Sequence, residues 1–441
     1  MANRWALRRL ADLASLHGEQ LDPAKHADKV FQLYSIPAFD QTRRPDKAKG
    51  SAIGSNKFTV PADAVLVSKL NPRIPRVWEP DIGNAEESLA STEFLVLRPK
   101  PGISARFLRY LCLSPAVRSE LQARATGTSG SHQRVRPEDA LAIEVLVPLD
   151  ANEQIAIARI LGALDDKIEL NRRMSETLEA IARALFKSWF VDFDPVRAKA
   201  EGRDPGLPEP IADLFPDRFE DSELGMIPAG WVIGPVGTLA ELAIGGDWGR
   251  DRPLDGDVEV RCLRGVDIDL LRRTGWSDAP KRYVSRASYE KRRPKPTDVL
   301  VEGSGQCGRS LASSEALTGV FLEPIIYSNF CKRLVTPSPD HALYLEYVLN
   351  DLVASGEMTN FVTGTAMPNL DHHGLLKGSM IVLPPTPVLV QFGRFAEVVR
   401  SRLFSPESRT LAEIRDALLP KLISGELRVP QAERLLEAAP A

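Results

Sequence analysis

Short segments recur in this chain of 441 residues, in the same order and at a nearly constant spacing. Thr-Gly-Thr occupies positions 126–128 and again 363–365, an offset of 237 residues. The other recurring pairs are Leu10–Ala14 with Leu239–Ala243, Val65–Val67 with Val299–Val301, Val145–Pro148 with Ile381–Pro384, and Gln154 with Gln391. Each pair is weak alone, but chance does not keep several of them in one order. The pattern predicts two diverged copies of one unit, at about 1–190 and 225–425.

Composition places the chain among globular proteins with several domains. Apolar residues make up 43% and charged residues 26%, and the length suggests roughly two to four domains. The sequence has no stretch of about 20 apolar residues, and its first residues have no signal-peptide pattern. We therefore expect a cytoplasmic protein that does not enter a membrane.

The cysteines and the net charge limit the possible functions further. The four cysteines are dispersed and form no CxxC pair, so neither a disulfide framework nor a zinc site is expected: Cys112, Cys262, Cys307 and Cys331. A net charge of −3 argues against a general nucleic-acid coat. It leaves room for local basic surfaces.

The first part of each copy has a mixed pattern. Short apolar runs at Ala64–Val67, Phe94–Leu97 and Ile143–Val147 are separated by Pro and Gly, and Ala105–Ala123 is typical of a helix. This combination predicts an α+β domain with short strands.

The second part of the first copy is strongly periodic. Apolar or small residues recur at alternating steps of four and three along one stripe: Ile157, Leu161, Leu164, Ile168, Asn171, Ser175, Leu178, Ala182 and Leu185. This spacing is the seam of a coiled coil, in which a polar residue such as Asn171 fixes the register. The pattern predicts one long helix over 152–188.

The second copy repeats the periodic part less regularly. Its seam is Val388, Phe392, Phe395 and Val399, followed by Leu411, Ile414, Leu418 and Leu422. We expect an interruption at Ser405-Pro406 and an end near Pro420. Two such stripes would pair antiparallel. The expected fold is therefore α+β: two similar domains separated by two long antiparallel coiled-coil helices, related by a pseudo-twofold axis.

One glycine-rich string resembles a nucleotide site. Gly303–Gly308 reads GxGxxG directly after the apolar run Val299–Val301, and Glu323 lies about 20 residues further on. The following segment shows no clear βαβ pattern, so a glycine-rich surface loop is the favoured interpretation. A nucleotide-dependent enzyme stays a third-ranked alternative. The chain has no P-loop motif, no GxSxG and no HExxH, and so offers no catalytic constellation.

Basic runs occur in both copies. Lys281–Lys295 carries seven basic residues against one acid, Glu290, with two tyrosines interleaved. The first copy has corresponding clusters: Arg43, Arg44, Lys47, Lys49 and Lys57, then Lys69, Arg73 and Arg76. One such run is usually a solvated face, but two in corresponding domains favour an anionic partner.

The Thr-Gly-Thr segments also favour binding. Residues 126–136 (TGTSGSHQRVR) and 363–369 (TGTAMPN) lie between a predicted helix and a predicted strand. Glycine allows a ligand to approach the backbone closely, and Gln, Asn and Arg can read base edges. An ordinary turn without a ligand is the alternative.

Three segments resemble a known family. Asn152–Asn171 with Leu185–Pro195 resembles the central conserved region of the specificity subunits of type I restriction–modification systems. Ser222–Trp231 resembles the entry to their second target-recognition domain, and Leu411–Leu427 resembles their C-terminal conserved region. The resemblance spans essentially the whole chain.

The resemblance implies a non-catalytic subunit that confers DNA sequence specificity. Two target-recognition domains, held apart by two antiparallel helices, would each bind one half of a split site in double-stranded DNA. Two modification subunits that methylate adenine, and restriction subunits that cleave, would dock on the chain. S-adenosylmethionine, ATP and Mg would belong to those partners, with no cofactor or metal in this chain. The implied boundaries are recognition domain 1 at 1–150, a helical spacer at 151–195, a linker at 196–224, recognition domain 2 at 225–385 and a C-terminal helical region at 386–441.

The expected DNA contacts lie in the loops and basic runs of both copies. In the first domain they are Ser68, Lys69, Asn71, Arg73, Arg76, Thr126, Gly127, Thr128, Ser129, Ser131, His132, Gln133 and Arg134. In the second they are Arg250, Lys281, Arg282, Tyr283, Arg292, Arg293, Ser304, Gln306, Arg309, Thr363, Gly364, Thr365, Met367 and Asn369. The competing hypothesis is a duplicated coiled-coil adaptor that never reads DNA.

Overall fold

The structure is a computed structural model that describes residues 5–41, 43–80, 87–127 and 133–437. The chain forms two compact units. Unit 1 comprises Met1–Ile168 and Arg409–Ala441, and unit 2 comprises Glu169–Ser408. Each unit combines helices with short strands, in agreement with the expected α+β class.

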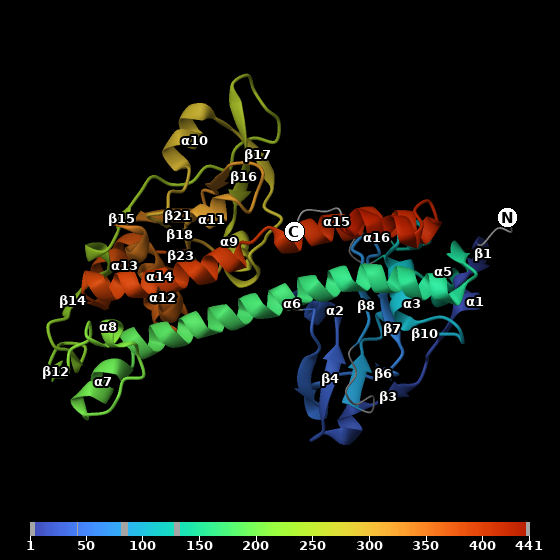
Figure 1. The fold of residues 1–441 in the computed structure, drawn as a ribbon, viewed down its shortest axis with the longest axis horizontal. Coiled ribbons are helices and arrows are strands. Elements are labelled where there is room, and N and C mark those ends of the chain that lie inside the picture. The colour runs from blue at the N-terminus through green and yellow to red at the C-terminus, as the bar shows by residue number, and fades with distance from the viewer. Residues whose placement is uncertain (1–4, 42, 81–86, 128–132, 438–441) are drawn as a thin grey trace. The chain divides into compact units, whose positions relative to one another are not determined.

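The expected long helix is present as α6 (Ala151–Phe190), which Figure 1 shows as one continuous helix. Its start is stabilised by the Asp150 side chain, which accepts a hydrogen bond from the backbone N–H of Asn152 at 2.9 Å. After its end, Phe193 adopts a left-handed conformation (φ 55°), and the next helix starts at Asp194 with Pro195 in its first turn. The seam residues Ile157 and Leu161 are 1% and 0% exposed, so the periodic stripe faces a core.

Unit 1 is built around two sheets. The first has the order β2-β10-β7-β8, and the second has the order β3-β6-β9-β4-β5. Their bounds are β2 Ala14–Leu16, β3 Gln20–Leu21, β4 Val30–Tyr34, β5 Asp46–Lys49, β6 Lys57–Thr59, β7 Val65–Ser68, β8 Val77–Trp78, β9 Ser88–Ala90 and β10 Phe94–Pro99. A separate ladder joins β1 (Trp5–Arg9) to β11 (Glu144–Pro148). Only β4 and β9 pair in parallel; the other pairs in these ladders are antiparallel.

The helices of unit 1 cover these sheets. Besides its part of α6, they are α1 Leu10–Leu13, α2 Ile36–Gln41, α3 Ala105–Leu113, α4 Pro115–Ala123, α5 Pro137–Leu141 and α16 Val429–Glu437. The single helix expected over 105–123 is wrong, because it is broken between α3 and α4. Pro115 holds Ser114 in an extended conformation (ψ 148°), and the Ser114 side chain caps α4 by accepting from the backbone N–H of Val117.

Unit 2 has a similar plan. One sheet has the order β15-β21-β18-β19 and another the order β17-β16-β20. Their bounds are β15 Glu241–Leu242, β16 Asp257–Leu263, β17 Lys281–Ser285, β18 Asp298–Glu302, β19 Ser310–Ala312, β20 Ile325–Tyr327 and β21 Cys331–Val335. The smaller ladders are β12 (Phe219–Glu220) with β13 (Ile227–Pro228), β14 (Val232–Pro235) with β24 (Met380–Leu383), and β22 (Val362–Thr363) with β23 (Asn369–Leu370).

Unit 2 also contains helices besides its part of α6, and three of them, α9, α10 and α12, contact its two larger sheets. The helices of unit 2 are α7 Asp194–Ala200, α8 Glu209–Ala212, α9 Gly265–Thr274, α10 Arg286–Arg292, α11 Glu315–Thr318, α12 Pro339–Ser355, α13 His372–Gly378 and α14 Thr386–Leu403. The core is aromatic where α6 ends: Phe186 and Phe190 contact Phe392 of α14, with ring centroids 6.0 and 5.3 Å apart. Here α14 packs through a predicted seam residue, Phe392, whereas α6 packs through two aromatic residues that lie outside its predicted stripe.

The strands of the two units follow one plan. In each four-stranded sheet, the earliest of its strands in the chain pairs with the latest, β2 with β10 and β15 with β21. Two strands that lie between them in the sequence complete the sheet, β7 with β8 and β18 with β19. In the second sheet of each unit, an antiparallel pair (β4 with β5, β16 with β17) adjoins a parallel pair (β4 with β9, β16 with β20). The same pairings thus recur in segments far apart in the sequence.

The C-terminal helices differ from expectation at one point. The interruption at Ser405-Pro406 is confirmed, because α14 ends at Leu403 and α15 (Glu407–Ser424) begins after it. The expected end near Pro420 is wrong, because α15 continues through this proline. Proline removes one backbone hydrogen bond, but the buried residues on either side, Leu419 and Leu422, hold the last turn against the core of unit 1.

The helix ends at Ser424 and is followed by Gly425, whose φ of 77° suits glycine. No helix within the described ranges combines the length and apolar character that a membrane crossing would need.

Candidate nucleic-acid interface

Two loops expected to contact DNA lie side by side in unit 1. The loop after β7 and the segment after α4 are joined by backbone hydrogen bonds: Asn71 N–H donates to Gln133 O at 2.8 Å, and Val135 N–H donates to Lys69 O at 3.0 Å. Arg134 also pairs with Thr126 through two backbone bonds of 2.9 Å. We call these segments, 68–76 and 126–136, loop pair 1. The expected residues Thr128, Ser129, Ser131 and His132 lie outside the described residues.

Three arginines of loop pair 1 differ in their contacts: two form ion pairs within unit 1, and the third is exposed. Arg76 is 7% exposed and forms two hydrogen bonds with Asp40, at 2.6 and 2.7 Å, so it links this loop to α2. Arg134 forms a similar two-bond pair with Glu93, and its guanidinium holds the pKa of Glu93 below the ordinary value. Arg73 is exposed at the surface of the loop.

Two further residues shape the backbone of loop pair 1. Ser68 is buried, and its hydroxyl donates to Leu70 O at 2.9 Å. Asn71 has a φ of 48°, a left-handed conformation that asparagine tolerates better than most residues. These two residues therefore set the direction in which the loop leaves β7.

Unit 2 brings the corresponding segments together in the same way. Gly305 N–H donates to Pro368 O at 3.1 Å, and Leu370 N–H donates to Gly303 O at 2.9 Å. The Ser304 hydroxyl also donates to Pro368 O, at 3.2 Å. We call these segments, 303–309 and 363–370, loop pair 2. In each unit, the loop after one inner strand of the four-stranded sheet, β7 or β18, is thus joined to the segment that contains Thr-Gly-Thr.

The GxGxxG string of loop pair 2 lacks the setting of a dinucleotide site. It connects β18 to β19, which pair antiparallel with Val301 opposite Ser310, whereas the nucleotide fingerprint opens a helix in a parallel βαβ unit. Gly308 has a φ of 92°, and a Cβ there would lie 2.5 Å from Met358. The glycines therefore serve a tight hairpin packed on the core.

Two titratable residues lie beneath this hairpin. Glu302 is 7% exposed, and burial raises the pKa of its carboxyl group, although Oε1 accepts from the backbone N–H of Gln306 at 3.1 Å. His372 lies against Gly303, and burial, together with the charge of Lys332, lowers its pKa to about 4. Both groups are therefore held neutral more readily than in water.

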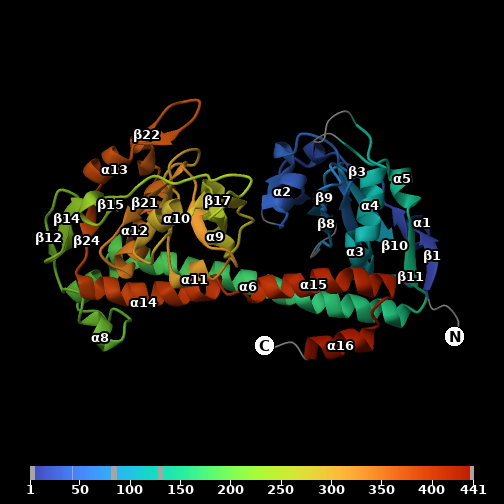
Figure 2. The ribbon, with the colours of Figure 1, turned by 90° about the horizontal axis from the view of Figure 1, so that it is seen from above.

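The second segment of loop pair 2 projects from unit 2. Figure 2 shows the β22–β23 hairpin extending away from α13 and the sheets. Thr363, Gly364 and Thr365 are exposed, as is Met367 at 63%. The Asn369 side chain donates to Met367 O at 2.9 Å and braces the turn. Its remaining polar atoms and those of Gln306 lie on the exposed surface.

The basic residues selected in β17 and α10 have partners within unit 2. Lys281 pairs with Glu259 and Glu323, at 2.9 and 2.6 Å. Arg282 pairs with Asp251 and stacks on Trp248. The other selected residues are paired too: Arg250 with Asp257, Tyr283 with Glu259, Arg292 with Gly245 O and Ser288, and Arg293 with Glu290. These contacts brace the β16–β17 hairpin, so a phosphate would have to share or displace them.

Other cations of the same region were not selected from the sequence. Arg286 and Lys291 on α10 are exposed and form no ion pair within the part of the chain that the structure describes. In unit 1, the same holds for Lys47 and Lys49, which lie two residues apart on β5, at the edge of its sheet. The sequence held a signal for three of them, because Lys291 has no acid three or four residues away on its helix, and Lys47 and Lys49 have none two residues away on their strand. Arg286, in contrast, has Glu290 four residues further along α10.

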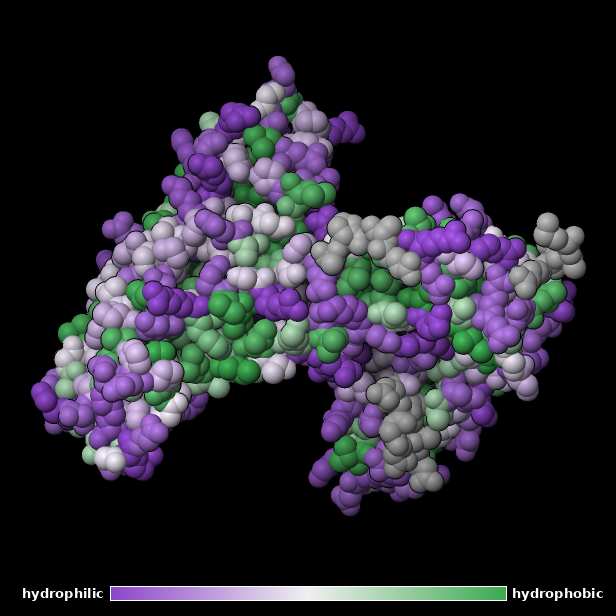
Figure 3. Space-filling model, viewed as in Figure 1, coloured by the Kyte–Doolittle hydropathy of each residue, from purple (hydrophilic) through white to green (hydrophobic). Residues whose placement is uncertain are grey.

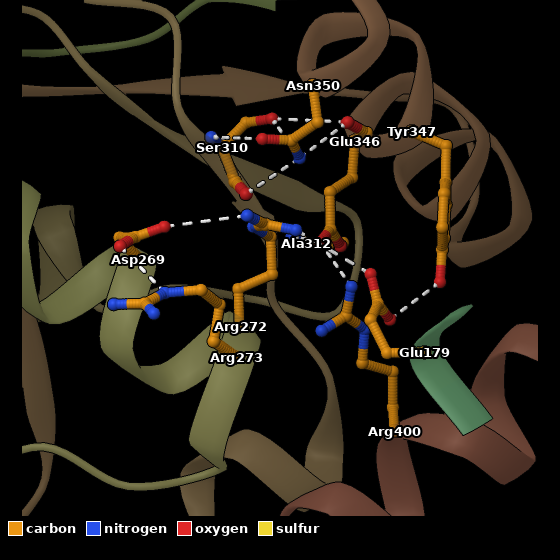
Figure 4. A network of polar contacts seen from close by, with 10 residues as sticks. All are labelled: Glu179, Asp269, Arg272, Arg273, Ser310, Ala312, Glu346, Tyr347, Asn350 and Arg400. Atoms are coloured by element: carbon orange, nitrogen blue, oxygen red, sulfur yellow. Dashed lines mark hydrogen bonds and ion pairs between the residues drawn. The ribbon is translucent and has the colours of Figure 1, made fainter. Parts of the chain in front are cut away.

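Arg309 closes the first segment of loop pair 2. Its guanidinium lies 3.6 Å from Asp269 of α9, a carboxylate that also pairs with Arg272 and Arg273. Asp269 belongs to a wider polar network that extends to α12, α14 and α6 (Figure 4). Loop pair 2 is therefore connected to the helices by charged groups as well as by packing.

The residues expected in the seams lie on the inner sides of their helices. Leu164 and Asn171 are buried on α6, Phe392 and Val399 on α14, and Leu418 on α15. Ser175, Ala182, Val388 and Leu422 are buried too, and the other seam residues are partly buried: Ile168, Leu178, Leu185, Phe395, Leu411 and Ile414. The Asn171 side chain donates to Glu407 at 2.9 Å and to Ser408 at 3.3 Å, so the polar seam residue is hydrogen-bonded where α15 begins.

Comparison with known proteins identifies related sequences over most of the chain. Residues 3–180 match the family "Type I restriction modification DNA specificity domain". The specificity subunit of the type I restriction enzyme HindI from Haemophilus influenzae is 26% identical over 432 residues, covering 85% of this chain and 88% of that protein. The MjaIX specificity subunit from Methanocaldococcus jannaschii is 24% identical, covering 76% and 71%.

A solved structure has the same fold. The S subunit of a type I restriction–modification system from M. genitalium superposes with a TM-score of 0.55 at 14% identity, covering 96% of this chain and 97% of that one. This likeness agrees with the mixed α+β fold and with the long helices. Residues 3–180 of this chain therefore match the DNA specificity domain of type I restriction–modification systems, and over most of its length the chain is similar to specificity subunits of such systems.

Proposed function

We propose that this subunit reads a split site in double-stranded DNA, with loop pair 1 on one half and loop pair 2 on the other. The observation that carries this proposal is the recurrence of one arrangement in both units: the same strand order, and the same joining of the loop after β7 or β18 to the segment that contains Thr-Gly-Thr. Two equivalent surfaces on one chain are suited to a DNA site with two recognised half-sites.

The chemistry of the loop pairs and of α10 suits both kinds of DNA contact. Arg73, Arg286 and Lys291 are exposed cations that can grip phosphates, a contact that positions a protein without reading sequence. Gln133, Gln306 and Asn369 carry amides that can bond to base edges in the major groove. The expected contacts at 128–132 and in the β17 segment belong to the same proposal.

The internal repeat defines the domains of the proposed subunit. Recognition domain 1 occupies 1–150 and recognition domain 2 occupies 225–385, with the spacer at 151–195, a linker at 196–224 and the C-terminal helical region at 386–441. A pseudo-twofold relation between the domains would present the two half-sites in opposite strand orientation, as palindromic sites match dimers.

The spacer in this proposal is an antiparallel pair formed by α6 with α14 and α15. Three contacts within the two units support it, because the residue numbers rise on one helix as they fall on the other. Within unit 1, Asp165 pairs with Arg415 at 2.6 Å. Within unit 2, Asn171 bonds to Glu407 and Phe186 packs on Phe392. The unread gap between the half-sites would then be a fixed length.

The helices also offer docking sites for partner subunits. We assign two methyltransferase subunits and the restriction subunits to the outward faces, where Leu170 and Ile181 of α6 and Val398 of α14 are 58%, 48% and 67% exposed. Figure 3 shows hydrophobic residues gathered along α14 and the adjoining part of α6 in unit 2. S-adenosylmethionine, ATP and Mg would bind to those partners. The methyltransferase would flip its target adenine out of the stack.

The test is genome-wide adenine-methylation sequencing in a host without this system. One strain expresses the chain with the methyltransferase subunit of its own system, and the control strain expresses the methyltransferase alone. The proposal predicts a split motif that appears only when both are present. A continuous motif, or the same motif in the control strain, would overturn it.

A further inference from the structure

A buried tyrosine connects the recognition domain of unit 1 to α6. Tyr110 on α3 is 0% exposed, and its hydroxyl donates to Asp165 Oδ2 of α6 at 2.7 Å. Arg109, the preceding residue, lies 2.7 Å from the same oxygen, and Arg415 of α15 donates to Asp165 Oδ1 at 2.6 Å. One carboxylate, 13% exposed, thus joins α3, α6 and α15.

The charges at this joint favour the ionised carboxylate. Burial raises the pKa of Asp165, but Arg109, Arg415 and the Tyr110 hydroxyl outweigh it and leave the pKa below its ordinary value. Burial raises the pKa of Tyr110, so its hydroxyl keeps the proton that it donates. The hydrogen bond is therefore between a neutral phenol and a charged acceptor, the stronger kind.

Unit 2 contains a second joint of the same form. Tyr347 on α12 is 4% exposed, and its hydroxyl donates to Glu179 Oε2 of α6 at 3.1 Å (Figure 4). Arg272 of α9 lies 3.7 Å from the other oxygen of Glu179. The residue before the tyrosine, Glu346, pairs with Arg400 of α14. This joint connects α12, α9, α6 and α14.

The two joints occupy equivalent positions. Tyr110 and Tyr347 are 237 residues apart, the same offset as the Thr-Gly-Thr segments. Asp165 and Glu179 are fourteen residues apart on α6, which is two heptads, and each directly follows a seam leucine, Leu164 and Leu178. The spacing therefore places both carboxylates at the same position of the heptad.

The charges beside the tyrosines are not the same in the two joints. Arg109 precedes Tyr110 and pairs with the acid of α6, whereas Glu346 precedes Tyr347 and pairs with a base of α14. The tyrosine–carboxylate bond is thus the part that both joints share, although the ion pairs around it differ. Tyr110 and Tyr347 are the residues to test.

We propose that the Tyr110–Asp165 and Tyr347–Glu179 bonds are positioning contacts that fix the angle of each recognition domain on α6 and thereby restrict the subunit to one gap length. The inference rests on the proposed reading of a split site. Apolar packing is non-directional and tolerates small rotations, whereas a buried hydrogen bond to a carboxylate fails unless donor and acceptor stay aligned. Removing the hydroxyl should loosen the angle of a domain and leave its reading loops unchanged.

The experiment measures methylation of a plasmid library by the assembled methyltransferase complex. The library keeps both half-sites and varies the gap by one or two base pairs on either side of the preferred length. The variants are Y110F, Y347F and the double variant, which keep the packing of the rings. The controls are Y344F, whose hydroxyl donates to Val382 O within the recognition domain of unit 2, and R106Q, which removes an exposed pair with Asp166.

The proposal predicts a broader gap preference in the tyrosine variants. Methylation at gaps one base pair from the preferred length should rise about tenfold relative to the preferred gap, because a hydrogen bond to a charged group contributes about a factor of ten. The half-site bases should stay unchanged, and Y344F and R106Q should behave like the unmodified chain. E179Q, which keeps an acceptor for Tyr347 but removes its charge, should broaden the preference less than Y347F does.

Two results would overturn the inference. In the first, Y110F and Y347F methylate less at every gap but keep the original gap preference, which is the effect of a purely structural bond. In the second, the half-site bases change with the gap. R415Q removes another partner of Asp165, through a side chain that is 23% exposed. The same predictions apply to this variant. Failure of the proposed function is distinguishable, because the unmodified chain would then show no split motif at all.

Discussion

Arg400 of α14 and Glu346 of α12 form an ion pair whose side chains are 0% and 1% exposed. Glu346 Oε2 also accepts the backbone N–H of Ala312 at 2.8 Å, and the Arg400 guanidinium lies 6.0 Å from the rings of Tyr347 and Phe404. Burial raises the pKa of Glu346, so the carboxylate depends on Arg400 for its charge. The pair ties α14 to α12 at one defined register within unit 2.

This pair predicts an asymmetric response to mutation. Replacing Arg400 with methionine leaves a buried carboxylate without its partner, which should lower the free energy of unfolding by about 3–5 kcal/mol. The double variant R400M/E346L removes both charges and should lose clearly less. Urea unfolding of the two variants and the unmodified chain measures the difference. A double variant less stable than R400M would contradict this account of the pair.

A second prediction concerns pH and His372. Its folded pKa, about 4, lies below its unfolded value of 6.5, so the unfolded chain binds the proton more readily. The stabilisation from the neutral imidazole is therefore complete above about pH 6.5 and is lost as the pH falls towards 4, at a cost of at most about 3 kcal/mol.

Thermal unfolding at pH 7 and pH 5 tests this prediction in the unmodified chain and in H372Q. The glutamine variant should lose part of the drop in Tm between the two pH values, because it has no group to protonate. His373, the exposed neighbour, supplies the matched control as H373Q. Equal drops in Tm for all three chains would show that His372 does not titrate in this range.

A third prediction separates two arginines of the same loop. Arg73 is exposed, whereas Arg76 is held by Asp40, although both were expected from the sequence to contact DNA. R73Q should reduce the slope of log K against log salt for DNA binding by about 1, with no change in sequence preference.

R76Q, in contrast, should lower Tm and leave the salt slope unchanged once the complex has assembled. DNA binding by the assembled complex at several salt concentrations, together with a melting curve, measures both effects. A reduced slope for R76Q with an unchanged slope for R73Q would reverse the assignment.

The long helix was predictable because its evidence is local. Every seam residue from Ile157 to Leu185 contributes to one period, and the structure extends the helix by only a few residues, to Ala151–Phe190. The break at Ser114 was visible in principle, since Ser-Pro is both a cap and a restriction on the preceding residue. The course of α15 through Pro420 was not, because it depends on how deeply Leu419 and Leu422 are buried.

The candidate interface was predictable only in part. The sequence marked 68–76, 126–136, 303–309 and 363–369 as separate loops, but no local pattern indicates that they are joined in pairs by backbone hydrogen bonds. The basic run in β17 looked available for the same reason: the partners of Lys281, such as Glu323, come from elsewhere in unit 2. Long-range pairing is what a single stretch of sequence does not contain.

A fourth prediction concerns the spacer. Inserting one heptad into α6 after Asn171, between Asp165 and Glu179, keeps the seam in phase and should lengthen or abolish the tolerated gap, with no change in the half-site bases. A seven-residue insertion at Gly202–Gly206, outside α6, is the control and should leave the gap unchanged. Methylation sequencing of both chains gives the gap directly. Altered half-site bases in the α6 variant would show that the helix does more than set a length.

The central claim is that each loop pair reads one half of the site, and methylation sequencing of loop variants tests it most directly. Q133A alters loop pair 1 at a partly exposed residue, and Q306A with N369A alters loop pair 2 at two exposed residues. Each chain is expressed with the methyltransferase in a host without this system. The account predicts that the first variant relaxes the bases of one half-site, that the second relaxes those of the other, and that the gap stays constant. Relaxation of both halves by either variant, or of the same half by both, would contradict it.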